Sequence, residues 1–424
     1  MSDKKLLVIS IDALMCGDLQ YIDQLPTLKK IMEGSSMVKQ MTSIYPTLTL
    51  PAHVAIATGC YPETNGVNHN EATLIPGKDQ PWNWYVDIVK VPFFWDKAKE
   101  AGYTTASIGW PVNGNAKADY VMPDIWTLDV EADPTELFAS AGAANIIDTV
   151  FNKNKHIMHW NYHPKYDRFV AACAADVVKL YGPDVMFVHV SPVDDFRHKY
   201  GTYGPHVLEA LQEVDSELAV ILAAYEEAGY AEHLDIAVLG DHGHLSAERN
   251  FRPNVLLAKE GLVRVDETGK AADWDAFCRS CDFSSTVYLK DPNDKELYDK
   301  VYALLKSYAQ NPEYGIGEVL THDEGKARFH VEGDYSFILE TDGKTTFGVE
   351  AVGDPVVYEG ICISSHGYMP TKGDKPPFIV KGPSFKSGVT IEAGRTIDVA
   401  VTLSVPYGVD MSHADGEVIS ELLK

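Results

Sequence analysis

Basic residues are scarce in this chain of 424 residues. Its 36 lysines and arginines face 61 aspartates and glutamates, so the formal net charge at pH 7 is −25. A protein with this charge repels nucleic-acid backbones and anionic membrane surfaces, and we expect neither as a partner. An acidic enzyme can still act on a phosphate ester if bound cations offset the repulsion locally. The charge balance therefore directs attention to residues that bind metals.

Cysteines and long apolar runs are also scarce. The six cysteines are scattered apart from Cys278 and Cys281, and one C-x-x-C motif without a second pair is weak evidence for zinc or redox chemistry. No segment has the roughly 18 consecutive apolar residues that a membrane-spanning helix needs. The apolar run from Leu6 to Ile11 is too short for a signal peptide and fits a buried first strand. These absences favour a cytoplasmic protein with free thiols.

Short apolar runs alternate with helical patterns along most of the chain, which predicts an α/β fold with a mostly parallel sheet. The clearest helix runs from Pro205 to Ala228, and Gly229 follows its end. Between 265 and 355 the pattern changes to short strands around an amphipathic helix. We expect one catalytic domain over 1–424 with a small α+β lobe inserted at 265–355. The expected core strands lie at 6–11, 104–110, 185–190, 235–240 and 378–380.

Carboxylates follow three of these strands, at Asp12, Asp194 and Asp241. Any one of them alone is better explained as the cap of a helix or turn. Ligands of open α/β sheets bind outside the carboxyl ends of the strands, so the three side chains are expected to converge. Asp194 and His198 are four residues apart, which places both on one face of a helical turn. His242 directly follows Asp241 and adds an imidazole.

His366, just before a glycine, completes a set of carboxylates and imidazoles that contains no thiolate. Such a set is typical of zinc or a similar divalent ion at a hydrolytic centre. Two ions a few ångströms apart can hold the attacking and leaving oxygens of a phosphoryl transfer.

A candidate nucleophile lies in the stretch YPTLTLPAHVAIATG, residues 45–59. Pro51 fits the first turn of a helix that ends near Thr58, which places Thr49 near the N-terminal cap. The helix dipole and the free N–H groups favour an anion there. Taken alone, Thr49 would be explained as a plain helix cap, with Thr47 one pleat earlier. Beside a two-ion cluster, Thr49 becomes the expected nucleophile.

Five motifs in this order resemble the nucleotide pyrophosphatase/phosphodiesterase family of the alkaline phosphatase superfamily. They are SIDAL (10–14), YPTLTLPAHVAIATGCYPETNGVNHN (45–70), VDDFRHKYG (193–201), GDHG (240–243) and SSHGYMP (364–370). The resemblance covers nearly the whole chain. It implies an alkaline-phosphatase-like fold, in which helices flank a mostly parallel central sheet. It also implies a hydrolase of phosphodiester or pyrophosphate bonds in small-molecule phosphate esters.

The resemblance assigns roles to the matched residues. Thr49 is similar to the nucleophile, which would form a phosphothreonine intermediate. Asn70 is similar to a hydrogen-bond donor to a phosphoryl oxygen, and Leu50 stands where a phenylalanine often holds a nucleobase. Two zinc ions per chain are implied. The first would be bound by Thr49, Asp12, Asp241 and His242, and the second by Asp194, His198 and His366.

Besides Leu50, three further departures from the family pattern bear on the nucleotide preference. Ala52 replaces a common asparagine, His244 makes the motif DHGH where DHGM is usual, and Arg197 replaces a small residue. The alternative is a phosphonate hydrolase or a phosphomonoesterase that uses the same metals and Thr49, and a non-catalytic metal-binding protein is a more remote one. We expect diesters to be cleaved faster than monoesters, because a dianion usually requires a further cation. This expectation requires Arg197 to point away from the ions. The oligomeric state is left open.

Other residues favour ordinary explanations. His53 is expected to pack or to hydrogen-bond rather than to bind a metal. The spacing of three histidines fits a helix face without a carboxylate at a suitable interval, and three aromatic residues are expected mainly to pack. These residues are His156, His159 and His163, and Trp82, Trp84 and Tyr85.

Overall fold

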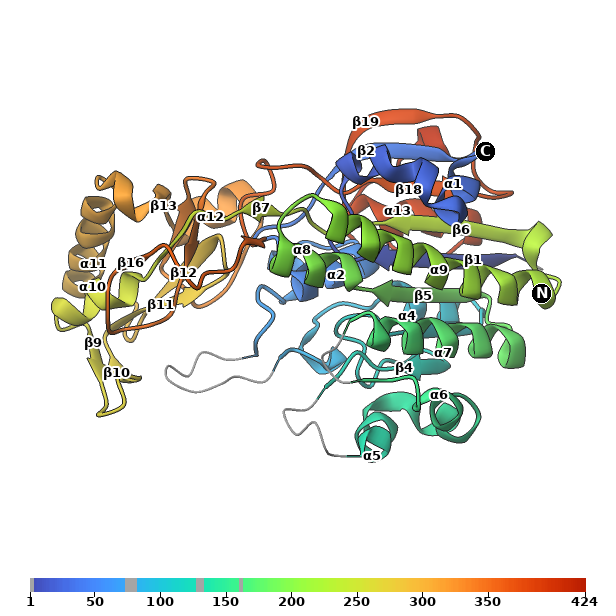
Figure 1. Ribbon diagram of the computed structural model, residues 1–424, viewed down its shortest axis with the longest axis horizontal. Coiled ribbons are helices and arrows are strands. Elements are labelled where there is room, and N and C mark those ends of the chain that lie inside the picture. The colour runs from blue at the N-terminus through green and yellow to red at the C-terminus, as the bar shows by residue number, and fades with distance from the viewer. Residues whose placement is uncertain (1–3, 73–81, 127–132, 160–162) are drawn as a thin grey trace.

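The computed structural model describes residues 4–72, 82–126, 133–159 and 163–424. Its centre is an eight-stranded sheet in the order β19-β2-β18-β6-β1-β5-β3-β4 (Figure 1). These strands are β1 (Lys5–Ile11), β2 (Ser36–Thr42), β3 (Thr105–Ile108), β4 (Tyr120–Met122), β5 (Val185–Val190), β6 (Leu234–Leu239), β18 (Phe378–Lys381) and β19 (Thr390–Arg395).

The sheet is mostly parallel, as the sequence predicts. β1 lies between β5 and β6 and pairs in parallel with both, and β3 pairs in parallel with β4 and β5. Only β18 runs antiparallel to its neighbours, β2 and β6. All five predicted strands are confirmed within a few residues, whereas β2, β4 and β19 are additional strands.

Helices cover both faces of this sheet. In β1, Leu7 and Ile9 pack into one hydrophobic cluster, and Leu6 and Val8 pack into another on the opposite face. The first cluster is covered by α1 (Pro26–Met32), α5 (Pro134–Phe138), α7 (Lys165–Tyr181), α8 (Pro192–Tyr200) and α9 (Pro205–Glu227). The second is covered by α2 (Thr49–Thr58), α4 (Phe94–Glu100) and α13 (Asp398–Ser404). The short helices are α3 (Pro62–Asn65) and α6 (Asn152–Asn154).

The helix expected at 205–228 is α9, which is confirmed to within one residue. Within the part of the chain that the structure describes, no helix is both long enough and apolar enough to cross a membrane.

A second group of strands lies on the left in Figure 1, apart from the main sheet. Its largest sheet is antiparallel, in the order β11-β12-β14-β13. A separate hydrophobic cluster joins it to the surrounding helices and includes Phe251, which precedes 265. The elements are β8 (Arg249–Phe251), α10 (Pro253–Lys259), β9 (Val263–Val265), β10 (Ala271–Trp274), β11 (Ala276–Ser280), β12 (Ser284–Leu289), α11 (Lys295–Tyr308), β13 (Ile316–Thr321), α12 (His322–Phe329), β14 (Phe337–Thr341), β15 (Thr345–Phe347) and β16 (Val356–Val357). The division of the chain at 265 and 355 stays a prediction.

The chain enters and leaves this second group of strands through two short paired strands, β7 (Leu245–Ser246) and β17 (Ser364–Ser365). β7 begins directly after His244, and β17 ends directly before His366. The antiparallel pairing of β7 with β17 therefore brings together two candidate site segments that are more than a hundred residues apart in the chain.

Candidate metal centre and active-site pocket

Three adjacent strands bring the predicted carboxylates together. Asp12 follows β1, Asp241 follows β6, and Asp194 lies in the first turn of α8, just after β5. Because β5, β1 and β6 are neighbours and parallel, their carboxyl ends meet at one edge of the sheet. The convergence expected from the sequence is what the structure shows.

The first donor group consists of Asp12, Asp241 and His242, whose ligand atoms all lie within 4.8 Å of one another. His242 Nε2 is 3.1 Å from Asp241 Oδ2, 3.5 Å from Asp12 Oδ1 and 3.2 Å from Thr49 Oγ1. Asp12 Oδ1 and Asp241 Oδ2 are buried and have no hydrogen-bond partner. Buried oxygens left without a donor are costly, and a divalent cation among them would satisfy both. The group therefore fits a metal ion.

A second donor group surrounds Asp194. Its Oδ2 lies 3.3 Å from His198 Nε2, and its Oδ1 lies 3.8 Å from His366 Nε2. His198 Nδ1 donates to the carbonyl oxygen of Ser364 at 2.9 Å, and His366 Nδ1 donates to that of Thr47 at 2.8 Å. A carbonyl can only accept, so in the neutral imidazoles each Nε2 has its lone pair toward Asp194. Ligating histidines in proteins are held in this way.

The ionisation of these residues also fits a cation. Burial, with the nearby charges of Asp241 and Asp194, raises the pKa of Asp12 well above its ordinary value. Burial alone would lower the pKa of His198, but Asp194 raises it to about 12. Burial lowers the pKa of His242 to about 4. Asp12 and His198 thus hold protons that a bound metal ion would replace, and His242 is neutral with a lone pair to offer.

Thr49 is the first residue of α2, and Leu48 takes the N-cap position. The sequence thus placed Thr49 to within one position. Next to it, the Asn70 side-chain carbonyl accepts a hydrogen bond from the Leu50 backbone N–H at 3.0 Å. This contact leaves the Asn70 amide nitrogen to donate elsewhere.

His53 donates to the Thr49 carbonyl and accepts from the Ser10 hydroxyl, both at 2.8 Å, so it hydrogen-bonds as expected.

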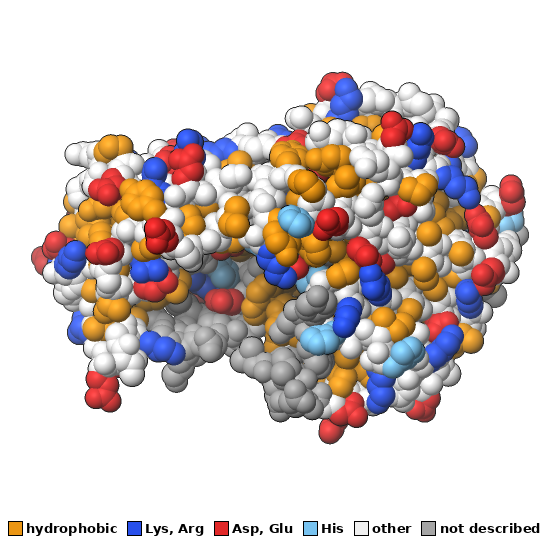
Figure 2. All heavy atoms as spheres, in the orientation of Figure 1, with side chains coloured by type: hydrophobic (Ala, Val, Ile, Leu, Met, Phe, Trp, Pro, Cys, Tyr) orange, Lys and Arg blue, Asp and Glu red, His pale blue; other side chains and the backbone are white. Residues whose placement is uncertain are grey.

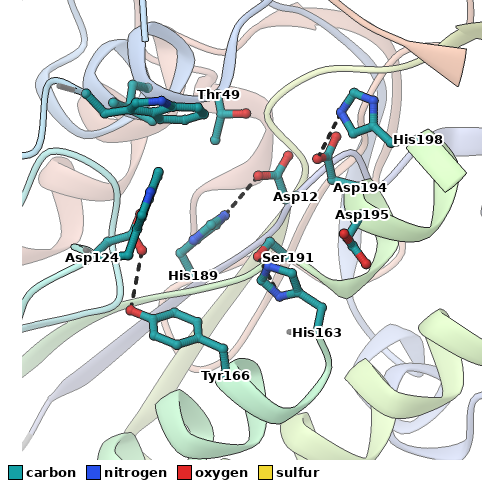
Figure 3. Close-up of a pocket in the computed structure, with 13 residues that line it drawn as sticks. Asp12, Thr49, Asp124, His163, Tyr166, His189, Ser191, Asp194, Asp195 and His198 are labelled. Atoms are coloured by element: carbon teal, nitrogen blue, oxygen red, sulfur yellow. Dashed lines mark hydrogen bonds and ion pairs between the residues drawn. The ribbon is translucent and has the colours of Figure 1, made fainter. Parts of the chain in front are cut away.

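A cavity of about 270 Å³ opens beside Thr49. Figure 2 shows a hollow near the middle of the visible face, with acidic and histidine side chains inside it. In Figure 3, the side chains of Asp12, Thr49, Asp194 and His198 lie on one side of this cavity. Asp124 and Tyr166 lie on the opposite side in this view, and His163, Trp82 and Trp126 also line the cavity. Among the described residues that line the cavity, none is a lysine or an arginine.

The histidine cluster at 156–163 differs from its predicted form. α6 ends at Asn154, so His156 and His163 do not share a helix. The expectation that no carboxylate joins these histidines is wrong, because His163 Nδ1 lies 2.5 Å from Asp167 Oδ2. Burial would lower the pKa of His163, but Asp167 raises it to about 9. The i,i+4 spacing of these two residues was a signal that could have identified the pair.

Two further histidines were missed as parts of the site. His189, in β5, lies with Nε2 3.1 Å from Asp12 Oδ2, while its Nδ1 donates to the Gly109 carbonyl. Its position as a lone polar residue in the apolar stretch VMFVHV was a usable signal. His244 Nε2 lies 2.7 Å from Asp194 Oδ1. Its sequence signal was the second histidine of the DHGH motif.

Arg197 points away from the donor groups, as the expected substrate preference requires. Its side chain is fully buried, and Nη2 lies 2.5 Å from Asp18 Oδ2. Its Nε donates to the Ala13 carbonyl at 3.3 Å, and Nη1 donates to the Thr202 carbonyl.

Of the three aromatic residues expected to pack, Trp82 contacts Trp126 at a ring separation of 4.8 Å and also lines the cavity.

The fold and the two donor groups at one sheet edge define an α/β protein built like the alkaline phosphatases. The chain belongs to the type I phosphodiesterase/nucleotide pyrophosphatase family, whose model matches residues 6–389. The predicted fold and the family resemblance are thereby confirmed. The chain is similar over nearly its full length to the solved structure of murine ectonucleotide pyrophosphatase/phosphodiesterase 5. That match has a TM-score of 0.69 at 18% identity and covers 99% of this chain and 100% of the other.

Curated relatives match a smaller part of the chain. Human ectonucleotide pyrophosphatase/phosphodiesterase family member 1 is 25% identical over 228 residues, which are 52% of this chain and 21% of the relative. The venom phosphodiesterase of Macrovipera lebetinus is 23% identical over 249 residues, which are 56% of this chain and 25% of the relative. The chain thus aligns with about a fifth to a quarter of the length of these relatives.

Proposed function

We propose that this protein is a two-zinc hydrolase that cleaves phosphodiester or pyrophosphate bonds through a covalent intermediate on Thr49. One observation carries the proposal. The Thr49 hydroxyl borders the cavity and lies 3.2 Å from His242, within a group whose buried carboxylate oxygens lack partners. Two similar proteins support it. One is described as a venom phosphodiesterase, and the other is a murine relative solved as an inactive threonine-to-alanine variant in complex with AMP.

The ligands are divided between two ions in this proposal. Asp12, Asp241, His242 and Thr49 would hold the first ion, and the group around Asp194 would hold the second. Carboxylate and imidazole donors without thiolates suit zinc. When bound, the ions would lower the pKa of nearby hydroxyl groups and offset the negative charge of the phosphoryl oxygens.

The residues of the chain have separate tasks in the reaction. The position of Thr49 at the start of α2 aims its hydroxyl at the positive end of the helix dipole, which favours the alkoxide. Thr49 gives its hydroxyl proton to water, Thr49 Oγ1 forms a bond to phosphorus while the bond to the leaving oxygen breaks, and the leaving oxygen takes up one proton from water in return. The Asn70 carbonyl accepts from the Leu50 N–H, and its amide nitrogen would donate to a phosphoryl oxygen. Water then hydrolyses the Thr49 ester and releases the phosphoryl product.

The lining of the cavity favours diesters over monoesters. A monoester dianion has one more negative charge than a diester, and an active site usually meets it with an additional cation. The described lining contains no lysine or arginine, and Arg197 is held by Asp18 outside the cavity. Asp194 and Asp195 add negative charge instead. A single negative charge is therefore the better match.

A comparison of kcat/KM for different substrate classes tests this proposal. With zinc-loaded protein, we expect kcat/KM for bis-p-nitrophenyl phosphate and thymidine p-nitrophenyl phosphate to exceed that for p-nitrophenyl phosphate at least about tenfold. Phosphonoacetate should release no phosphate. A preference for the monoester, or cleavage of the phosphonate, would contradict the proposal and favour the alternative with the same site.

A further inference from the structure

The turn after β6 places two histidines, His242 and His244, beside the donor groups. Between His242 and His244, a side-chain carbon at Gly243 would lie 2.1 Å from the carbonyl oxygen of Asp374, so this position accepts only glycine. Both histidines are buried, and their ring centroids are 6.0 Å apart. The chain therefore turns tightly enough for both rings to reach the site.

The surroundings of His244 are those of a ligating histidine. Its Nε2 lies 2.7 Å from Asp194 Oδ1, and its ligand atom is within 4.8 Å of those of Asp194, His242 and His366. Its Nδ1 lies 3.0 Å from the hydroxyl of Ser364. His198 and His366 have the same arrangement, with Nδ1 on a polar group and Nε2 toward Asp194. One nitrogen fixed by a polar partner and the other facing the donors is typical of metal ligands.

We propose that His244 is an additional ligand of the second metal ion, which would then be held by Asp194, His198, His244 and His366. The inference rests on the proposed function only in that a second ion is bound at Asp194. The competing explanation makes His244 a positioning residue, whose Nε2–H donates to Asp194 without contact to the ion. The two explanations differ in which nitrogen carries the proton.

Hydrogen bonding around Ser364 is compatible with His244 as a ligand. The Ser364 hydroxyl lies 3.0 Å from that of Thr202, which in turn lies 2.9 Å from the hydroxyl of Ser246. The Ser364 hydroxyl can therefore donate a hydrogen bond to Thr202 and accept one from His244 Nδ1–H. His244 Nε2 then has the lone pair. His366 Nε2 also faces Asp194 Oδ1, at 3.8 Å. Asp194, His244 and His366 would all be ligands of a cation bound among these atoms.

A fourth protein ligand has a measurable consequence. Zinc at a catalytic site usually has three protein ligands and an open position, whereas four protein ligands complete a tetrahedral set. The second ion should therefore be bound more tightly, and exchange more slowly, than an ion held only by Asp194, His198 and His366.

X-ray absorption on the zinc-loaded wild-type protein tests this without any substitution. With His242 on the first ion, four imidazoles shared by two ions give an average of about two per zinc, against about one and a half if His244 does not bind. A fitted value near one and a half would overturn the proposal. Fewer than two zinc ions per chain would overturn it too, together with the metal part of the proposed function.

Chelator competition on His244→Gln and His244→Ala separates a ligand from a positioning residue. Glutamine can still donate an amide hydrogen to Asp194 but is a poor zinc ligand, so both variants should bind the second zinc at least about tenfold more weakly. His69→Gln is the control, because His69 is a buried histidine that hydrogen-bonds to the Ser280 carbonyl, away from the donor groups. Its zinc affinity should stay within about twofold of wild type.

Retention of wild-type zinc affinity by His244→Gln would show that His244 only positions Asp194, and would overturn the proposal. The outcome is separable from the proposed function. If both ions bind as described and the variants lose affinity, but no diester is cleaved, the assignment of His244 stands and the proposed function fails.

Discussion

At the scale of single residues, two nearby threonines have different surroundings. Replacing each of them by alanine should therefore have a different effect on activity and stability. Thr49 Oγ1 borders the cavity, whereas Thr47 Oγ1 is buried, donates to the Tyr368 carbonyl at 3.0 Å and accepts from the Gly367 N–H at 2.9 Å. Thr49→Ala should lower kcat for a diester by about three orders of magnitude and keep both metal ions. Thr47→Ala should keep kcat within a few-fold and lose about 1–2 kcal/mol of stability. Equal losses of kcat in the two variants would refute the assignment of the nucleophile.

Arg197 and Asp18 form a buried ion pair, so the role of Arg197 is expected to be structural. Arg197→Met should leave the ratio of diester to monoester kcat/KM unchanged within about twofold. It should lower the free energy of unfolding by about 3 kcal/mol, because Asp18 loses its partner. The double variant with Asp18→Asn should recover part of that loss. A marked fall in monoester cleavage by Arg197→Met alone would show that its charge reaches the substrate.

Sequence patterns could identify the residues that follow strands, such as Asp12 and Asp241, because a strand end fixes where the next side chain lies. For His189 they offer only its polarity within the apolar stretch of β5, and they offer nothing for Asp124, whose place depends on the loop after β4. The direction of Arg197 likewise depends on Asp18, which is far from it in the sequence.

At the scale of elements, the start of α7 contains a pH-sensitive contact. Asp167, in its first turn, raises the pKa of His163 to about 9 from an ordinary value of 6.5. A pKa raised in the folded state stabilises the protein fully below pH 6.5, and the effect is lost as the pH rises through about 9. Relative to His163→Gln, the wild type should lose up to about 3 kcal/mol between these pH values in chemical denaturation. Parallel pH profiles of the two proteins would contradict this.

β14 supports the segment that leads to Thr49. Glu340 in β14 is buried and accepts hydrogen bonds from the Tyr45 hydroxyl at 2.9 Å and from Lys372 at 2.7 Å. Glu340→Ala leaves the Tyr45 hydroxyl without this acceptor and Lys372 with only the Thr341 carbonyl, and should cost about 3 kcal/mol of stability, measured by urea unfolding. Glu340→Gln keeps an acceptor and should cost about 1 kcal/mol. Similar losses in both variants would show that these hydrogen bonds contribute little.

Elements with a clear hydrophobic pattern could be predicted. The strands β1 and β5 are fully buried, and such strands appear in the sequence as runs of mostly apolar residues. β2 could not, because its buried and exposed residues alternate imperfectly and it gains its strand form by pairing with β18 and β19. Its place in the sheet depends on residues more than three hundred positions away.

At the scale of the whole molecule, the net charge of −25 and the acidic lining of the cavity have the same consequence. The described cavity lining contains no lysine or arginine, so in the proposed function the two donor groups would gather the positive charge for a phosphate ester as metal ions. The paired strands β7 and β17 help to complete the second donor group, because they bring His244 and His366 to Asp194.

The central claim is that the reaction passes through an ester of Thr49. The direct measurement is mass spectrometry of zinc-loaded protein quenched in acid during turnover of thymidine p-nitrophenyl phosphate. Attack by Thr49 expels nitrophenol, so the peptide that contains Thr49 should carry a thymidylyl group, and Thr49→Ala should carry none. Full turnover with no adduct on Thr49, or an adduct on another residue, would contradict the account.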